Sequence, residues 1–243
     1  IYSIILYHSE GDKDMKLFAH RGYSAQYPEN TMEAFIQAYQ KGFDGVETDV
    51  HMTKDGQLVL IHDETIDRTS DGKGYIQDYT YDELKRFSFS HGSAGYYPLP
   101  LLKDLLTFIQ DKDFLVNIEL KTDVIHYTEL EEKVHQLVCQ LGVEKKIYYS
   151  SFYLPSVLKM KSLYPQGYVG YLMEENYDKK YQELLKYHIG AFHPRYDFLN
   201  SQRIKQLKQH NILVASWTIP DFKEYQRLKE LGVDILISNE YLR

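Results

Sequence analysis

The sequence predicts an α/β fold, a (β/α)8 TIM barrel with a small insertion after the second strand. Short apolar stretches of strand length alternate with segments of helical periodicity, and eight such stretches can be recognised. The length of 243 residues suits a single barrel of this kind. An open, doubly wound sheet would produce a similar alternation, so the pattern alone leaves that alternative open.

The boundaries of several elements can be predicted from local signals. The predicted strands cover residues 16–19, 45–49, 114–119, 147–151, 168–172, 191–193, 212–217 and 234–238. Three of the intervening helices have a capping residue with Glu three positions later, and a Gly at the other end. The predicted caps are Asn30, Thr128 and Asp221, and the predicted stops are Gly42, Gly142 and Gly232.

One stretch, residues 62–113, departs from this alternation. It carries a Gly- and Ser-rich turn, a capped helix over 80–87 and a Gly/Ser/Tyr/Pro segment over 91–100. We therefore expect an insertion over 62–113 within a single domain that runs from 16 to 243.

The first residues of the chain call for a separate prediction. Their apolar run is much shorter than the roughly 20 residues of a membrane-spanning helix, and it lacks a basic flank and a cleavage site. Met15 leads directly into the first predicted strand and is a candidate natural start. We therefore expect residues 1–15 to be an N-terminal extension and the chain to make no stable membrane insertion.

Charge and cysteine content limit the class of protein. The 28 basic and 35 acidic residues give a net charge of -7 without long blocks of one sign, which argues against nucleic acid as a partner. Cys139 is the only cysteine, so no intrachain disulfide can form, and we expect a cytoplasmic protein. The sequence contains no signal for an oligomeric state.

Two histidines and two carboxylates in the first quarter of the chain indicate a chemistry. Glu47 and Asp49 are two apart in a predicted strand and therefore point to the same face. His20 and His62 supply groups that titrate near neutrality, and carboxylates can hold the cation that an anionic substrate requires. This combination suits metal-assisted cleavage of a phosphate ester.

A hairpin pattern predicts how His62 reaches the carboxylates. Taking Asp55-Gly56 as a two-residue loop pairs residues 54 and 57, and this register places His62 opposite Asp49 on the same face. His51 shares that face one pair further along, so we expect it at the rim of the site.

Five motifs in this order resemble the glycerophosphodiester phosphodiesterase family. The similarity is strongest over residues 16–121, and each motif falls at the end of a predicted strand or in the loop that follows. The motifs are His20-Arg21-Gly22, Pro28-Glu29-Asn30-Thr31, Glu47-Thr48-Asp49, His62 and Glu119-Leu120-Lys121.

The resemblance implies a bound metal as cofactor. In the family, three carboxylates hold one divalent cation, Ca²⁺ or Mg²⁺, and they correspond here to Glu47, Asp49 and Glu119. Oxygen-only ligation suits hard cations of this kind. Three converging carboxylates also need a cation, because unit charges 4 Å apart repel by about 4 kcal/mol at an effective dielectric of 20.

The resemblance also implies the catalytic and substrate-binding residues. His20 and His62 match the two family histidines, which act as general acid and general base in an order that the sequence leaves open. Arg21 and Lys121 suit the nonbridging phosphate oxygens. Trp217, the only tryptophan, stands at a predicted strand end where we expect it to contact the alcohol portion of the substrate.

Two further expectations concern the surroundings of the site. Glu29 and Asn30 are predicted to support the residues that touch substrate and metal, while Asn30 is equally well interpreted as a helix cap. The chain departs from the family pattern at 238–241, where Asn239 replaces an Asp, and at Pro220, which replaces an Asn. We expect these changes to affect recognition of the alcohol and barrel closure, but not to touch the metal or the histidines.

The function implied by the resemblance is metal-dependent hydrolysis of small glycerophosphodiesters to sn-glycerol 3-phosphate and an alcohol. The attacking group is either water or a neighbouring substrate hydroxyl. One alternative is a phospholipase-type enzyme of the same fold that acts on intact lipid, for which residues 96–99 are the one candidate apolar rim. A second alternative is a barrel that binds phosphodiesters without turning them over.

Overall fold

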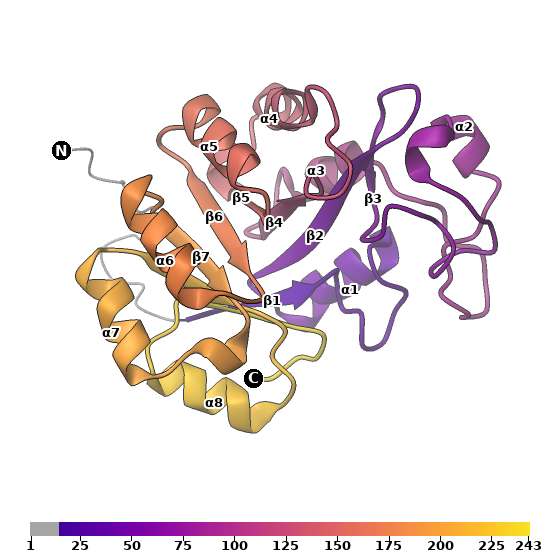
Figure 1. Cartoon of the computed structure of the whole chain (residues 1–243). Coiled ribbons are helices and arrows are strands. Elements are labelled where there is room, and N and C mark those ends of the chain that lie inside the picture. The colour runs from indigo at the N-terminus through magenta and orange to yellow at the C-terminus, as the bar shows by residue number, and fades with distance from the viewer. Residues whose placement is uncertain (1–14) are drawn as a thin grey trace.

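The computed structural model describes residues 15–243, which form a closed barrel of eight parallel strands surrounded by helices (Figure 1). The strand order runs from β1 through β9, β8, β7, β6, β5 and β4 to β2, and pairing of β1 with β2 closes the ring. The predicted (β/α)8 barrel is therefore confirmed over the open sheet. The barrel strands are β1 (Lys16–His20), β2 (Gly45–Met52), β4 (Leu115–Leu120), β5 (Ile147–Ser151), β6 (Tyr168–Met173), β7 (Ala191–Pro194), β8 (Leu213–Ser216) and β9 (Ile235–Ser238).

Helices cover the outside of the ring, and their apolar faces pack on the outward side chains of the strands. Within residues 15–243, no helix combines the length and the apolar character needed to cross a membrane. The covering helices are α1 (Met32–Lys41), α3 (Leu102–Ile109), α4 (Leu130–Leu141), α5 (Leu154–Leu163), α6 (Tyr177–Lys186), α7 (Ser201–Gln209) and α8 (Phe222–Glu230).

The segment between β2 and α3 lies to one side of the barrel (Figure 1). It contains β3 (Leu58–Leu60), the 3-10 turn η1 (Ile76–Asp78) and α2 (Tyr81–Leu84). Most of its buried apolar residues form a cluster of their own, whereas Leu58 and Leu60 of β3 and the helix α3 pack into the main core. The division of the chain into an insertion over 62–113 and the rest of the domain stays a prediction. Of the predicted N-terminal extension, all residues except Met15 lie outside the described residues.

The predicted helix ends are partly wrong. Thr31, not Asn30, caps α1, because the Thr31 side chain accepts from the backbone of Ala34 while Asn30 is drawn into the barrel. Likewise α4 begins after Glu129 and has no side-chain cap, so Thr128 does not serve as one. The Asp221 cap of α8 is confirmed. These errors arise where tertiary contacts outweigh local capping preference.

The predicted hairpin register is wrong by one residue. The pairing of His51 with Val59 places Ile61 rather than His62 across from Asp49, and the backbone of Ile61 donates to the carbonyl of Asp49 at 3.1 Å. His62 instead follows the end of β3, where the chain leaves the ladder.

The register shifts because the turn holds three residues instead of two. The Thr53 amide donates to the carbonyl of Gln57, and Gly56 takes a left-handed conformation with φ +80°. The Thr53 hydroxyl accepts from the amide of Gln57 and donates to Asp55. This is a three-residue loop whose last residue is left-handed, and the Thr53 side chain favours it over the shorter turn.

The turn after β1 depends on Gly22 and yields a test of the local fold. Gly22 has φ +80°, and a Cβ there would lie 2.6 Å from the Cβ of Ala34 on α1. We expect Gly22→Ala to lower the free energy of unfolding by roughly 2 to 4 kcal/mol, since strain and overpacking add. Gly92 shares the backbone conformation, with φ +82°, but has open space around it. Gly92→Ala should therefore cost only ~1 kcal/mol in urea unfolding. Equal losses for both variants would contradict the close approach to Ala34.

Candidate active site

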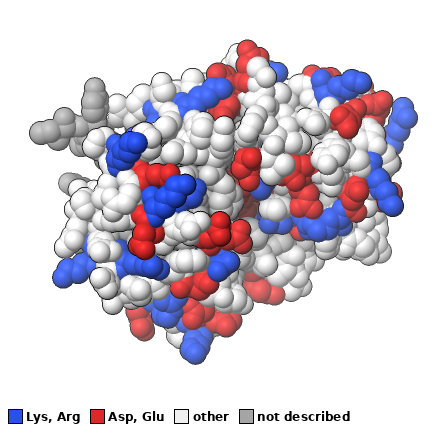
Figure 2. All heavy atoms as spheres, viewed as in Figure 1, with Lys and Arg blue, Asp and Glu red and all other residues white. Residues whose placement is uncertain are grey.

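The predicted site residues converge on a cavity at the carboxyl-terminal ends of the barrel strands. The cavity has a volume of about 1010 Å³ and is lined by His20, His62, Glu47, Glu119 and Lys121, among others. On the face of the molecule shown in Figure 2, acidic and basic side chains are interspersed. Parallel strands end on one side of the barrel, so residues far apart in the sequence meet there.

Three carboxylates form a cluster at the cavity: Glu47 and Glu119 line it, and Asp49 is buried beside them. Glu47 and Asp49 lie on β2 and Glu119 lies on β4, with Asp49 and Glu119 aligned in the strand register. One oxygen from each of the three lies within 4.8 Å of the others, and all three side chains are buried. Lys121 is the nearest cation to Glu119, with Nζ 2.9 Å from Oε1, and it lies 3.8 Å from Asp49.

The electrostatics of this carboxylate cluster favour a bound cation. Burial and the adjoining Asp49 and Glu119 raise the pKa of Glu47 well above its ordinary range. Burial also raises the pKa of Glu119, against the opposing charge of Lys121. Asp49 differs, because Lys121 and Arg21 outweigh burial and lower its pKa. The positive charges of Lys121 and Arg21 thus do not fully balance the negative charge of the three carboxylates. The oxygen donors of the cluster fit a hard divalent ion.

His20 stands at the end of β1 and is held by the last loop of the barrel. Its Nδ1 lies 2.7 Å from Oδ1 of Asn239, and its Nε2 lies 3.9 Å from the Glu47 carboxylate. Because an amide oxygen only accepts, Nδ1 carries the proton and Nε2 is left with its lone pair. Burial and the charge of Arg21 lower the pKa of His20 to about 4. The expectation that Asn239 does not touch the histidines is therefore wrong.

His62 has a partner of different chemistry. Its Nδ1 lies 2.6 Å from Oδ1 of the neighbouring Asp63. His51 lies beneath it, fully buried, with Nε2 3.1 Å from the carbonyl of His62 and Nδ1 bonded to Tyr127. The expectation that His51 lies at the rim is therefore wrong. It is buried and supports the loop that carries His62.

Arg21 and Asn30 hold the carboxylates from the loop after β1. The backbone of Arg21 donates to Glu47 at 3.0 Å, and its Nε lies 3.6 Å from Asp49. The Asn30 amide donates to Asp49 at 2.9 Å and accepts from the Thr48 hydroxyl. Both residues have left-handed backbones, with φ +57° for Arg21 and +55° for Asn30, which turn them into the barrel.

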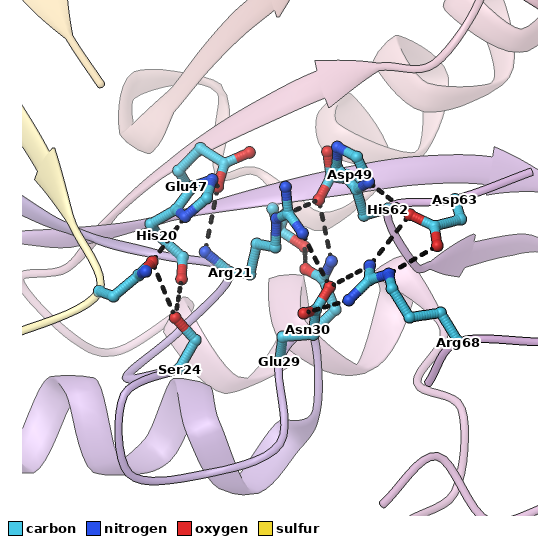
Figure 3. A network of polar contacts seen from close by, with 12 residues as sticks. His20, Arg21, Ser24, Glu29, Asn30, Glu47, Asp49, His62, Asp63 and Arg68 are labelled. Carbon is cyan, nitrogen blue, oxygen red and sulfur yellow. Dashed lines mark hydrogen bonds and ion pairs between the residues drawn. The ribbon is translucent and has the colours of Figure 1, made fainter. Parts of the chain in front are cut away.

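Glu29 belongs to a polar network that the sequence patterns do not reveal (Figure 3). It accepts from Arg21 Nη1 at 2.9 Å and from both terminal nitrogens of Arg68 at 2.8 Å. Arg68 also donates to Asp63, the partner of His62. No motif or spacing in the sequence singles out Asp63 or Arg68. The one available signal is that Asp63 directly follows the predicted catalytic His62.

An aromatic wall borders the same cavity. Trp217 follows β8, donates from Nε1 to the carbonyl of His193 at 2.8 Å, and meets Phe152 edge to face with ring centroids 5.6 Å apart. Phe198 lines the cavity as well. The sequence singled out Trp217 but not Phe152 or Phe198, which follow strands without any motif.

Comparison with known proteins agrees with this geometry. The model of the glycerophosphoryl diester phosphodiesterase family matches residues 20–242. The chain belongs to this family. The predicted family membership is therefore confirmed, and with it the prediction of a phosphoric diester hydrolase.

Several relatives align with this chain over nearly its whole length. A glycerophosphodiester phosphodiesterase of Caldanaerobacter subterraneus is 35% identical over 228 residues, 92% of this chain and 93% of the relative. One of Bacillus altitudinis is 35% identical over 225 residues, 90% of this chain and 92% of the relative. Among solved structures, an Oleispira antarctica phosphodiesterase in complex with the product sn-glycerol-3-phosphate has a TM-score of 0.83, with 28% identity and 92% of each chain covered.

The raised pKa of Glu47 predicts how stability responds to its removal. A carboxyl group with a higher pKa in the folded state binds its proton more tightly there, so its contribution to stability falls as the pH rises above the ordinary value of 4.5. At pH 7 in chelator, Glu47→Gln should therefore raise the free energy of unfolding by ~1 kcal/mol and should weaken stabilisation by added Ca²⁺ or Mg²⁺.

Glu29→Gln provides a control of opposite sign. Despite burial, Arg68 and Arg21 lower the pKa of Glu29 to about 2, so its charged form stabilises the fold above pH 4.5. This variant should lose stability in chelator and keep its response to the cations. Thermal unfolding with and without Ca²⁺ measures both; an unchanged cation response in Glu47→Gln would count against the acidic cluster as the cation site.

Proposed function

We propose that the chain hydrolyses glycerophosphodiesters, such as glycerophosphocholine and glycerophosphoethanolamine, to sn-glycerol 3-phosphate and an alcohol. The observation that carries the proposal is the convergence of two imidazoles with a buried acidic cluster in one cavity. The names of the relatives and the product bound to the Oleispira antarctica enzyme support the substrate class. The substrate is a small molecule that the cavity can enclose.

Glu47, Asp49 and Glu119 would hold one divalent cation, Ca²⁺ or Mg²⁺. When bound, such an ion supplies positive charge that polarises the phosphoryl group and neutralises charge on its oxygens. The chain adds two cations of its own on the same side. Arg21 and Lys121 offer N–H donors to the nonbridging oxygens, and Arg21 Nε makes no hydrogen bond within residues 15–243. These donors stabilise the charge that develops in the transition state.

The hydrogen bonds of the two histidines support different roles. Asn239 keeps the proton of His20 on Nδ1, so Nε2 can accept the proton of the attacking group, water or a substrate hydroxyl, as general base. The Asp63 carboxylate contacts Nδ1 of His62 and orients its imidazole, and we assign His62 the role of general acid that donates a proton to the leaving alcohol.

Trp217 and Phe152 form an apolar surface for the alcohol portion of the substrate. Glu29 and Asn30 support the site without touching substrate. Glu29 holds the Arg21 guanidinium, and Asn30 holds the Asp49 carboxylate. This arrangement leaves the anionic end of the substrate over the cations and the alcohol against the aromatic rings.

The phospholipase alternative finds little support around residues 96–99. Leu99 is buried in the small cluster beside β3. The Tyr96 ring is exposed, but its hydroxyl donates to the carbonyl of Lys85 and so ties the side chain to the protein surface. A bilayer-binding enzyme needs an exposed apolar surface, and this segment turns part of its apolar area inward.

The proposal is tested with a panel of glycerophosphodiesters assayed for release of glycerol 3-phosphate, with Ca²⁺ or Mg²⁺ and with chelator. We expect turnover of at least one diester with added cation and loss of turnover in chelator. Undiminished turnover in chelator would overturn the metal requirement. Retention of the diester without product would indicate a binding protein, and hydrolysis of diacyl lipid in liposomes would indicate the phospholipase.

The acid and base assignments are tested by changing the leaving group. For a choline diester, His20→Ala and His62→Ala should each lower kcat by roughly 10²- to 10⁴-fold. For the p-nitrophenyl diester, whose leaving group needs no proton, the loss in His62→Ala should shrink to less than about 10-fold while that in His20→Ala persists. If the shrinkage occurs in His20→Ala instead, the two roles are reversed.

A further inference from the structure

Arg68 joins the two halves of the site, and we propose that it is a positioning residue that holds the general acid His62 and the phosphate-binding Arg21 in one fixed geometry. The inference rests on the proposed function, because it assigns Arg68 a part in that reaction. Arg68 itself does not line the cavity, so it acts through Asp63 and Glu29.

The contacts of Arg68 form two carboxylate clamps (Figure 3). Nη1 and Nη2 donate to the two oxygens of Glu29, each at 2.8 Å. Nε and Nη2 donate to the two oxygens of Asp63, at 2.7 and 3.0 Å. The planar guanidinium therefore fixes both carboxylates at once, a geometry that an ammonium group cannot reproduce.

Each clamped carboxylate holds a residue of the reaction. Oε1 of Glu29 also accepts from Arg21, and Oδ1 of Asp63 is the oxygen that contacts His62. Without Arg68, Asp63 would keep its contact with His62 but lose the donors that fix its rotation, and Glu29 would be held by Arg21 alone. A carboxylate free to rotate no longer keeps the imidazole in the orientation needed for proton transfer.

The chain connectivity gives the network a second consequence. Glu29 belongs to the loop between β1 and α1, whereas Asp63 and Arg68 belong to the segment after β3. Arg68 thus fastens the loop carrying His62 to the loop carrying Arg21, across elements that are not neighbours in sequence. An isolated exposed ion pair contributes little, but here one cation serves four hydrogen bonds in a connected network.

The test compares Arg68→Met with the parent enzyme on two diesters that share the glycerophosphate half. For the choline diester, where His62 must protonate the leaving group, we expect kcat to fall roughly 10- to 100-fold, the scale seen when a supporting contact of a reactive group is removed. For the p-nitrophenyl diester the fall should be clearly smaller, because that leaving group needs no acid and only the part of the loss that acts through Glu29 and Arg21 remains. A purely structural role would lower both rates equally.

Two further variants keep the test decisive. Arg68→Lys retains the charge but cannot clamp both carboxylates, so it should show the same split with a smaller amplitude and serves if Arg68→Met does not fold. Arg243→Met removes another bidentate arginine, which pairs with Asp44 at the opposite end of the barrel. We expect it to lower the melting temperature without any dependence on the leaving group.

The outcomes separate this inference from the function on which it rests. Absence of turnover in the parent enzyme would overturn the proposed function itself. Normal turnover in the parent with equal losses on both diesters in folded Arg68→Met and Arg68→Lys, or with no loss at all, would overturn the positioning role alone.

Discussion

The arrangement of the site follows from one unfavourable interaction, the mutual repulsion of three buried carboxylates whose oxygens lie within 4.8 Å of one another. Such a cluster persists in a folded protein only if charge is brought to it or protons are retained. The chain does both in part. Lys121 and Arg21 hold Asp49 in its charged form, and Asn30 adds a hydrogen bond, while Glu47 and Glu119 keep raised pKa values. The remaining imbalance of charge fits the binding of a cation by these oxygens.

The same charge distribution separates the two imidazoles by environment. His20 is buried beside Arg21 and is bonded to an amide, so its protonated form is disfavoured. His62 contacts a carboxylate instead of an amide, and this contact orients its ring. Two residues of one chemical type are thereby made unlike by their partners, as acid and base catalysis of one bond requires.

Much of the fold and of the acidic cluster could be predicted from the sequence because both depend on local periodicity and on strand parity. Glu47 and Asp49 share a face whatever surrounds them. Glu119 was predicted only through the family resemblance, and the structure shows that parallel pairing of β2 with β4 brings it alongside Asp49. The prediction of the hairpin register was wrong because the Thr53 side chain stabilises a longer turn, which the Asp55-Gly56 pair does not indicate. For Asn30 the prediction of a supporting role agrees with its bond to Asp49, and only its interpretation as a helix cap was wrong. For Asn239 the prediction was wrong because its bond to His20 joins residues far apart in the sequence, and single-sequence patterns carry no information on such pairs.

Closure of the barrel brings His20 together with its hydrogen-bond partner. All five family motifs lie within residues 16–121, yet the partner of His20 comes from the loop after β9, at the other end of the chain. The pairing of β9 with β1 aligns Ser238 with Ala19, and so brings Asn239 next to His20. Without docking of β9, the His20 imidazole would lack the contact that places its proton on Nδ1. The pairing of β1 with β9 that closes the ring therefore also shapes the site, because the loop after β9 sets the environment of His20 although it brings no acidic or basic group to that histidine.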